Sequence, residues 1–178
     1  MSTHTLHFFC GKAGAGKSTL ATKVATLTSA VLISEDIWMA RLYPTELHTF
    51  EDYLKYAERL KRVVGPLVID LLKHQNVVLD FPANTVEGRK WYRMLCTAAR
   101  ADHTLHYLEA PDDLCLSHIA RRNEERPEGS HYLSEETFHH ITSYFQAPRP
   151  DEGFHVRVHR PAEVALAETA SAEDRPSP

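Results

Sequence analysis

Residues 11–18 read Gly-Lys-Ala-Gly-Ala-Gly-Lys-Ser, and they match the pattern G-x-x-x-x-G-K-[ST] in full, with Thr19 following. A short apolar run at residues 6–10 precedes this stretch, and residues 17–28 after it carry the apolar spacing of a helix. A glycine-rich loop between a strand and a helix is the setting that a phosphate-binding loop requires. The stretch therefore predicts nucleotide binding.

The chemistry of such a loop explains its residue types. Glycine lets the backbone curl, so that successive N–H groups point at phosphate oxygens, and the following helix N-terminus adds partial positive charge. We expect Lys17 to reach the β- and γ-phosphates of ATP and the Ser18 hydroxyl to ligate Mg²⁺. The glycine spacing does not fit a dinucleotide-binding loop, because the third glycine would fall at Thr19. The predicted nucleotide-binding residues of the loop are Gly11, Ala13, Gly14, Ala15, Gly16, Lys17, Ser18 and Thr19.

Apolar runs alternate with helical patterns along the rest of the chain. Strands are expected at residues 6–10, 30–34, 77–80, 104–108 and 154–158, and helices at residues 17–28, 36–42, 49–73, 86–101 and 112–125. A further helix is expected to begin at Ser134, and Pro66 is expected to kink or split the long helix. The alternation predicts an α/β fold, a three-layer α/β/α domain around a five-stranded, mostly parallel sheet. One domain over residues 1–160 is expected, followed by a short helix and a disordered tail over residues 161–178.

Composition excludes several classes of protein. The chain has 178 residues, of which 43% are hydrophobic and 25% charged, as in a single globular domain. The net charge of −4 argues against a generically basic nucleic-acid binder, and no apolar run approaches the roughly 18 residues of a membrane span. The three cysteines lie far apart and never form a C-x-x-C pair, which indicates neither a disulfide framework nor a cysteine zinc site. We expect a cytoplasmic monomer or homodimer whose 12 histidines lie mostly at the surface.

Carboxylates follow the second and third predicted strands. Glu35 and Asp36 end the second, Asp80 ends the third, and both places open onto the phosphate-loop side of a parallel sheet. A kinase needs a carboxylate to accept the proton of the attacking hydroxyl and an acidic group near Mg²⁺. We assign Asp36 as the base and Asp80 as the metal-side or substrate-orienting carboxylate. Glu35 could instead be the base, and Asp36 could instead cap the helical turn that follows it.

Arginines cluster before a loop that contains Pro127 and Gly129. We expect a lid over about residues 122–133 that closes on ATP and offers Arg122 and Arg126 to the transferring phosphoryl group. These two arginines share a helix face if the helix extends that far, whereas Arg121 could pair with Glu125. The alternative is a solvated helix end. Arg149 is expected near the adenine, with a plain connector as the alternative.

Several of these segments together resemble a known family. They are GKAGAGKST at 11–19, LISEDIWMARLYP at 32–44, VVLDF at 77–81, RRNEERPEG at 121–129 and PRPDEGF at 148–154. They resemble the P-loop small-molecule kinases of the predicted-kinase, AAA-like ATP-binding group, which is related to polynucleotide kinase, chloramphenicol phosphotransferase and zeta toxins. The resemblance implies an adenylate-kinase-like core with a helical lid, ATP and Mg²⁺ as cofactors, Asp36 as the catalytic aspartate, and Arg122 and Arg126 as lid residues.

The residues expected at the acceptor site match the polynucleotide kinase pattern in one stretch and differ from it in another. Asp80, Asn84 and Arg89 look like the D-x-x-x-N…R arrangement of polynucleotide kinases. That branch has an arginine two or three residues beyond its catalytic aspartate, where this chain has Trp38 and Met39, and Arg41 comes later. This departure weakens a nucleic-acid acceptor. The residues expected to contact the acceptor are Asp36, Trp38, Arg41, Tyr53, Asp80, Asn84 and Arg89, with core packing as the alternative for the aromatic ones.

The sequence thus predicts a kinase that moves the γ-phosphoryl group of ATP to a hydroxyl of an antibiotic-, sugar- or nucleoside-like small molecule. A nucleic-acid 5′-hydroxyl kinase is one alternative. An ATP-binding switch or ATPase without a small-molecule acceptor is another. No membrane partner is expected.

Overall fold

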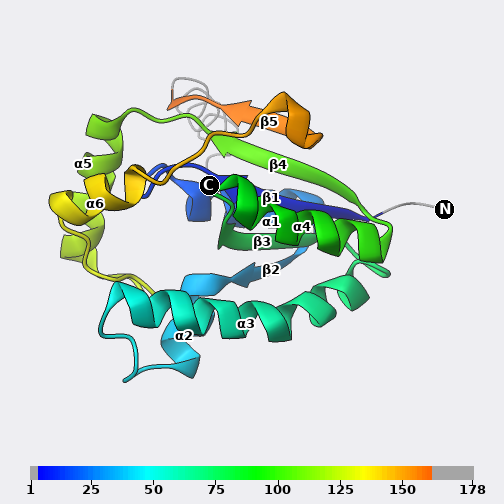
Figure 1. Ribbon diagram of the computed structural model, residues 1–178, viewed down its shortest axis with the longest axis horizontal. Helices are drawn as coiled ribbons and strands as arrows, with labels where there is room; N and C mark the ends of the chain where they lie inside the picture. Colours follow the sequence, from blue (N-terminus) through cyan, green and yellow to red (C-terminus); the bar gives the residue numbers. More distant parts are fainter. Residues whose placement is uncertain (1–3, 162–178) are drawn as a thin grey trace, which may run out of the picture.

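Five parallel strands form the centre of the molecule in the order β2-β3-β1-β4-β5 (Figure 1). This computed structural model describes residues 4–161, so the helix and tail expected over residues 161–178 lie almost wholly outside the described residues. The strands are β1 Thr5–Cys10, β2 Val31–Ser34, β3 Val77–Pro82, β4 Asp102–Leu108 and β5 Val156–His159. The predicted α/β fold with a five-stranded sheet is confirmed, and every strand pair is parallel.

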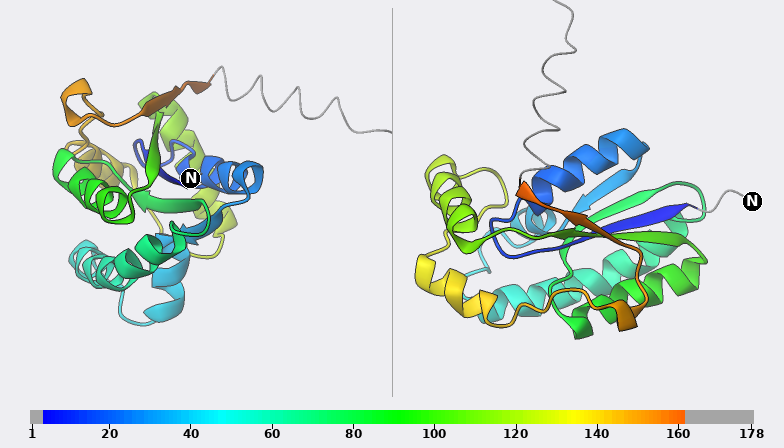
Figure 2. Two further views of the ribbon diagram at one scale, coloured as in Figure 1. Left: turned by 90° about the vertical axis from the view of Figure 1, so that its right-hand side faces the viewer. Right: turned by 90° about the horizontal axis from the view of Figure 1, so that it is seen from above.

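Within residues 4–161, six α-helices and one 3₁₀ turn surround the sheet. They are α1 Lys17–Thr28, α2 Glu35–Leu42, α3 Phe50–Leu71, α4 Val86–Ala99, α5 Asp112–Glu125, α6 Glu135–Thr142 and the 3₁₀ turn η1 Pro150–Glu152. Figure 2 shows α1 on one face of the sheet and α3 with α4 on the other. The helices α5 and α6 lie beyond the carboxyl ends of the strands (Figure 1).

Both faces of the sheet are buried, which explains the continuous apolar runs of its strands. Phe8 and Leu79 pack in the larger core beneath α3 and α4, whereas their neighbours Phe9 and Val78 pack against α1. Consecutive strand residues point to opposite faces, so a strand covered on both sides needs apolar residues at every position.

The long helix α3 runs without a break through Pro66, so Pro66 does not split it. A capping box between Thr49 and Asp52 fixes the first turn of α3. Further along, Leu60, Val64 and Val68 are buried in the core. Proline removes one backbone hydrogen bond, and packing on both sides of Pro66 offsets that loss.

The edge strand β5 begins two residues later than expected, at Val156. Phe154 is not part of it, because its ring instead packs edge-on against Phe8 and His103. Most of the described histidines are at least partly exposed, as expected, but His7 and His106 are buried next to each other on β1 and β4. Within residues 4–161, no helix is long and apolar enough to cross a membrane.

Candidate active site

The phosphate-binding loop connects β1 to α1, in the strand–loop–helix setting that the sequence predicted. Gly14 and Gly16 have φ angles of 74° and 95°, a conformation that favours glycine. A Cβ at Gly14 would lie 2.3 Å from the carbonyl oxygen of Cys115, so α5 packs too closely for any side chain there. His118 of α5 hydrogen-bonds to the Gly14 carbonyl oxygen at 2.8 Å. These contacts fix the shape of the loop from the α5 side.

Lys17 lies across the inside of the loop. Its ammonium donates to the carbonyl oxygens of Gly11, at 2.6 Å, and Lys12, at 2.8 Å. Burial lowers the pKa of Lys17, and the nearby carboxylates of Asp80 and Asp36 oppose that shift. The arrangement places a buried positive charge at the centre of a ring of backbone groups, where phosphate oxygens would bind.

Asp80 comes from the neighbouring strand β3. Its carboxylate accepts hydrogen bonds from the Ser18 hydroxyl and from the Ser34 hydroxyl, the latter at 3.5 Å. Burial raises the pKa of Asp80, and the Ser18 hydrogen bond opposes that rise. A hydroxyl beside a carboxylate is the hard-oxygen donor set that suits Mg²⁺. Among residues 4–161, no group of three or more His, Cys, Asp and Glu side chains could hold a metal by itself, so the phosphates of a nucleotide would have to complete the coordination.

Two adjacent carboxylates, those of Glu35 and Asp36, open α2. The extended Ser34 before them occupies the N-cap position and no side chain makes a cap hydrogen bond, so the alternative that Asp36 caps this helix is wrong. Tyr53 of α3 lies between the two carboxylates. Its hydroxyl donates to Glu35 Oε1 at 2.5 Å and lies 3.4 Å from Asp36 Oδ1.

The two carboxyl groups differ in their surroundings. Glu35 is 1% exposed, and its Oε2 has no hydrogen-bond partner among the described residues. Burial raises the pKa of Glu35 to about 7, and the hydrogen bond from Tyr53 opposes the rise. Burial also raises the pKa of Asp36, but His131, Arg122 and Lys17 oppose it with positive charge. Asp36 is therefore the carboxyl group that lies among cations.

The expected lid begins where α5 ends. The helix α5 ends at Glu125, as predicted, and Arg126 follows it with a φ of 47°. The condition that the helix extends to Arg126 is therefore not met, and Arg126 does not share a helix face with Arg122. The cause is local, since the residue before a proline avoids helical geometry and Pro127 follows. Arg122 remains in the last turn, with its Nε buried and unpartnered among the described residues. Arg121 lies 3.9 Å from Glu125, as expected.

The loop after α5 packs against the start of α2. A Cβ at Gly129 would lie 2.9 Å from the carbonyl carbon of Asp36. Arg41 makes two hydrogen bonds with Glu128, at 2.7 and 3.0 Å. The rings of His131 and Tyr53 meet edge-on with centroids 6.2 Å apart. The loop therefore covers the carboxylates that open α2.

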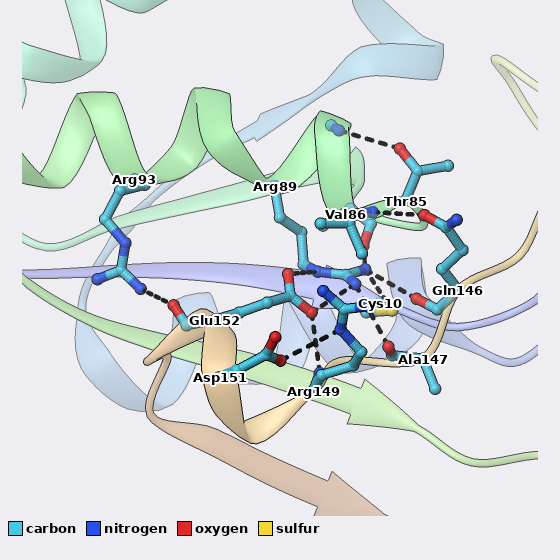
Figure 3. Close-up of polar contacts among 12 residues, drawn as sticks. Cys10, Thr85, Val86, Arg89, Arg93, Gln146, Ala147, Arg149, Asp151 and Glu152 are labelled. Carbon is cyan, nitrogen blue, oxygen red and sulfur yellow. Dashed lines mark hydrogen bonds and ion pairs between the residues drawn. The ribbon is translucent and has the colours of Figure 1, made fainter.

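The acceptor residues expected from the sequence are only partly brought together. Trp38 and Tyr53 are partly buried beside the core. Arg89 is completely buried, and both its Nε and Nη2 bind the Glu152 carboxylate, at 2.7 and 2.8 Å (Figure 3). Its Nη1 donates to two backbone carbonyls. The expectation that Arg89 contacts an acceptor is wrong, because every donor group of its guanidinium already has a protein partner.

Asn84 and Arg149 lie at supporting positions. The Asn84 side-chain oxygen accepts from the Gly11 N–H at 3.0 Å, which ties the end of β3 to the start of the loop. Arg149 is exposed and lies 3.2 Å from Asp151, in the segment that carries Glu152 (Figure 3). A contact of either residue with acceptor or adenine stays a prediction.

Sequence reasoning missed three neighbours of the site. His118, His131 and Glu152 come from segments far along the chain from the residues that they contact. No spacing pattern links them to those residues. The Pro-Asp-Glu-Gly loop is expected, with Arg149, near the adenine or as a plain connector, and nothing in it pointed to Arg89 as a partner. Single histidines carry no positional signal.

Comparisons with known proteins agree with this geometry. A family model described as an AAA domain matches residues 6–148. No curated protein matches the sequence. Among solved structures, a putative kinase from Chloroflexus aurantiacus is similar, with a TM-score of 0.67 and 15% identity over 98% of this chain and 100% of that one.

Two further kinases share the fold. The Mycobacterium tuberculosis APS kinase CysC, solved in complex with AMPPNP and APS, has a TM-score of 0.61 and 18% identity, covering 98% of this chain and 100% of that one. A sugar kinase from Janibacter sp. has a TM-score of 0.58 and 16% identity, covering 97% of this chain and 95% of that one. Likeness at these identities shows a common P-loop kinase fold.

Proposed function

Because the chain belongs to the AAA domain family and has the fold of P-loop kinases, we propose that it transfers the γ-phosphoryl group of ATP to a hydroxyl of a small molecule. One observation carries the proposal: Lys17 follows β1, Asp36 follows β2, Asp80 lies in β3 between these strands, and the three side chains lie within electrostatic reach of one another. A phosphate anchor, a metal-side carboxylate and a base are the groups that phosphoryl transfer requires.

ATP would bind with its phosphates in the loop. The backbone N–H groups and the Lys17 ammonium would bind the phosphate oxygens, and Lys17 would exchange its present carbonyl partners for them. Ser18 and Asp80 would hold Mg²⁺, which supplies charge neutralisation at the phosphates when bound. The unpartnered Nε of Arg122 is a donor available to the transferring group.

Asp36 would act as the base. The acceptor oxygen attacks the γ-phosphorus as its proton passes to the Asp36 carboxylate, and the bond from the γ-phosphorus to the bridging oxygen breaks to release ADP. The proton then leaves to solvent, which restores the carboxylate. The loop that packs on α2 through Gly129 would exclude water from this step.

The charges around Asp36 favour an uncharged or cationic acceptor. Asp36 and Asp80 both raise the pKa of Glu35, and Asp36 raises the pKa of Asp80, so the three carboxyl groups lie close together. The two arginines that could have bound an anionic acceptor are occupied by carboxylates, Arg41 by Glu128 and Arg89 by Glu152. A sugar, polyol or amino alcohol fits this electrostatic setting better than a nucleotide or a nucleic-acid end.

A panel of acceptors tests the proposal. The protein is incubated with Mg-ATP and, in turn, neutral sugars and polyols, amino alcohols, 3′-nucleotides and a 5′-hydroxyl oligonucleotide, and products are identified by phosphorus NMR. We expect a phosphomonoester with a neutral or cationic compound, formed in step with ADP. A Lys17→Ala variant serves as the control for contaminating kinases.

Each other result has a defined meaning. ATP hydrolysis to inorganic phosphate, at a rate that no acceptor changes, would contradict the kinase and support an ATPase or switch. Phosphorylation of the oligonucleotide in preference to small molecules would support a nucleic-acid kinase and contradict the argument from charge.

A further inference from the structure

The Tyr53 hydroxyl lies between two carboxylates that compete for its single proton. It is 2.5 Å from Glu35 Oε1 and 3.4 Å from Asp36 Oδ1. A phenol has one O–H to donate, so only one carboxylate can receive it at a time. The distances show that Tyr53 donates its hydrogen bond to Glu35. Asp36 therefore has no strong hydrogen-bond donor on the side of Tyr53.

Burying the Glu35 carboxyl group destabilises the folded state. It is 1% exposed, and Oε2 has no partner among the described residues. A buried polar atom without a hydrogen bond destabilises the native state. An apolar side chain of similar size would remove that cost. At 1% exposure Glu35 does not itself meet a ligand, so its effect must pass through a neighbour.

Charged and titratable groups surround this pair on every side. Near Glu35 lie Asp36 on α2, Tyr53 and Lys61 on α3, Asp80 on β3 and Tyr92 on α4. Near Asp36, His131 and Arg122 of the α5 end and following loop and Lys17 of α1 add positive charge. Asp36 thus has three cations that lower its basicity, and Glu35 with Asp80 act in the opposite direction.

We propose that Glu35 is a positioning residue for the catalytic carboxylate: it accepts the hydrogen bond of the Tyr53 hydroxyl and so leaves Asp36 free to accept the proton of the acceptor. This inference rests on the proposed function, in which Asp36 is the base. A hydrogen bond to a carboxylate stabilises its charged form and weakens it as a base. Glu35 prevents that loss by being the nearer and better acceptor for Tyr53.

The substitution Glu35→Gln reverses the competition. The Gln amide oxygen is uncharged and accepts hydrogen bonds more weakly than a carboxylate does, so Tyr53 would donate to Asp36 instead. The negative charge beside Asp36 is lost as well. Both changes lower the pKa of Asp36, and we expect a fall of about one pH unit, a tenfold change in its proton affinity.

The test measures this pKa directly. The full chain is labelled with ¹³C at the carboxyl carbons of Asp and Glu, and Asp36 is titrated by NMR without nucleotide, metal or acceptor. Wild type is compared with Glu35→Gln, and with Glu58→Gln as the matched control, because Glu58 is an exposed carboxylate on the same long helix that carries Tyr53. An Asp36 pKa that moves no more in Glu35→Gln than in Glu58→Gln would overturn the proposal.

A second variant separates an effect through Tyr53 from one through space. In Tyr53→Phe, Glu35 loses its one hydrogen bond and should titrate at least tenfold more weakly as an acid. Adding Glu35→Gln to Tyr53→Phe should then leave Asp36 unchanged within twofold, because Glu35 is already neutral there. An equal fall in the Asp36 pKa with and without Tyr53 would mean that simple charge, and no shared proton, links the two residues.

The two hypotheses can fail separately. The titrations need no acceptor, so they stand whatever the acceptor panel finds. Should Glu35→Gln not fold, the Tyr53→Phe titration of Glu35 still decides the matter: an unchanged Glu35 pKa contradicts the hydrogen bond on which the proposal depends.

Discussion

Arg41 and Glu128 join α2 to the loop that follows α5 through two hydrogen bonds, of 2.7 and 3.0 Å, across 87 positions of sequence. The same loop touches Asp36 through Gly129. The ion pair therefore links this loop to the helix that carries the proposed catalytic carboxylate. It also neutralises Arg41, which the sequence analysis expected to contact the acceptor.

Breaking the ion pair between Arg41 and Glu128 should loosen the loop after α5 without changing the stability of the rest of the protein. Both side chains are exposed, so Arg41→Ala should leave global unfolding almost unchanged, since exposed ion pairs contribute little stability. Hydrogen exchange of residues 127–133 should become several-fold faster, because local opening no longer breaks the pair. Arg62→Ala removes the exposed pair with Glu58 on α3 and serves as the control. Unchanged exchange in Arg41→Ala would show that other contacts hold the loop.

The buried pair of Arg89 and Glu152 should matter for stability instead. Arg89→Ala would leave the Glu152 carboxylate, 8% exposed, without its partner, and would open a cavity under α4. Removing one partner of a buried ion pair costs roughly 3–5 kcal/mol, so the urea midpoint should fall sharply. Lys90→Ala, which removes an exposed pair with Glu87, should change it little. Equal midpoints for the two variants would contradict the structural role of Arg89.

The contrast between Arg41 and Arg89 shows which contacts can be predicted from the sequence. The phosphate loop and the carboxylates at strand ends were predictable, because contiguous residues or the geometry of a parallel sheet place them. Arg89 was misread because its partner lies 63 residues away, in a segment that looked like a turn. The end of α5 at Glu125 was predicted and is confirmed, because Pro127 disfavours helical geometry at Arg126. The helix α3 continues through Pro66 because of tertiary packing, which the local sequence does not predict.

Three histidines form a row across the sheet that should make stability depend on pH. His106 Nε2 lies 3.1 Å from His7 Nδ1, and its Nδ1 lies 2.9 Å from His159 Nε2. Burial, with the positive charge of the neighbouring histidines and Arg157, lowers the pKa of His106 to about 3, against 6.5 for a free histidine. The folded state therefore binds fewer protons than the unfolded state between these values.

The sign of the effect follows from linkage. His106 has no effect on stability above pH 6.5, and stability should fall by about 1.4 kcal/mol for each pH unit below it, down to about pH 3. Glu35 acts oppositely, because its raised pKa of about 7 stabilises the folded state at low pH. Comparison of wild type with His106→Gln cancels the Glu35 contribution, and the exposed His74→Gln is the control. Parallel urea-stability profiles for wild type and His106→Gln would contradict this prediction.

Asp36→Asn tests the proposed base. The amide keeps the size and a hydrogen-bond acceptor but cannot take a proton, so phosphoryl transfer should fall roughly 10²–10⁴-fold. ATP affinity should change little, because Lys17 and the loop N–H groups carry nucleotide binding. The transfer rate with the best acceptor from the panel and the Kd of an unreactive ATP analogue are the two measurements. Near-normal transfer would contradict the assignment of Asp36 as the base.

The arginines at the end of α5 give the sharpest distinction between a kinase and a simple ATP-binding protein. Arg122 lies close to Asp36 with its Nε buried and unpartnered among residues 4–161, whereas the exposed Arg121 pairs with Glu125. Arg122→Ala should lower the transfer rate by roughly 10²-fold or more while weakening ATP-analogue binding far less, because its charge serves the transition state. Arg121→Ala is the matched control, one residue away on the same helix, and should change neither.

Arg126, exposed beyond the helix end, should have an intermediate effect if the loop moves inward when ATP and acceptor bind. Equal losses from Arg121→Ala and Arg122→Ala would reduce this helix end to a structural element and remove the argument for a catalytic arginine.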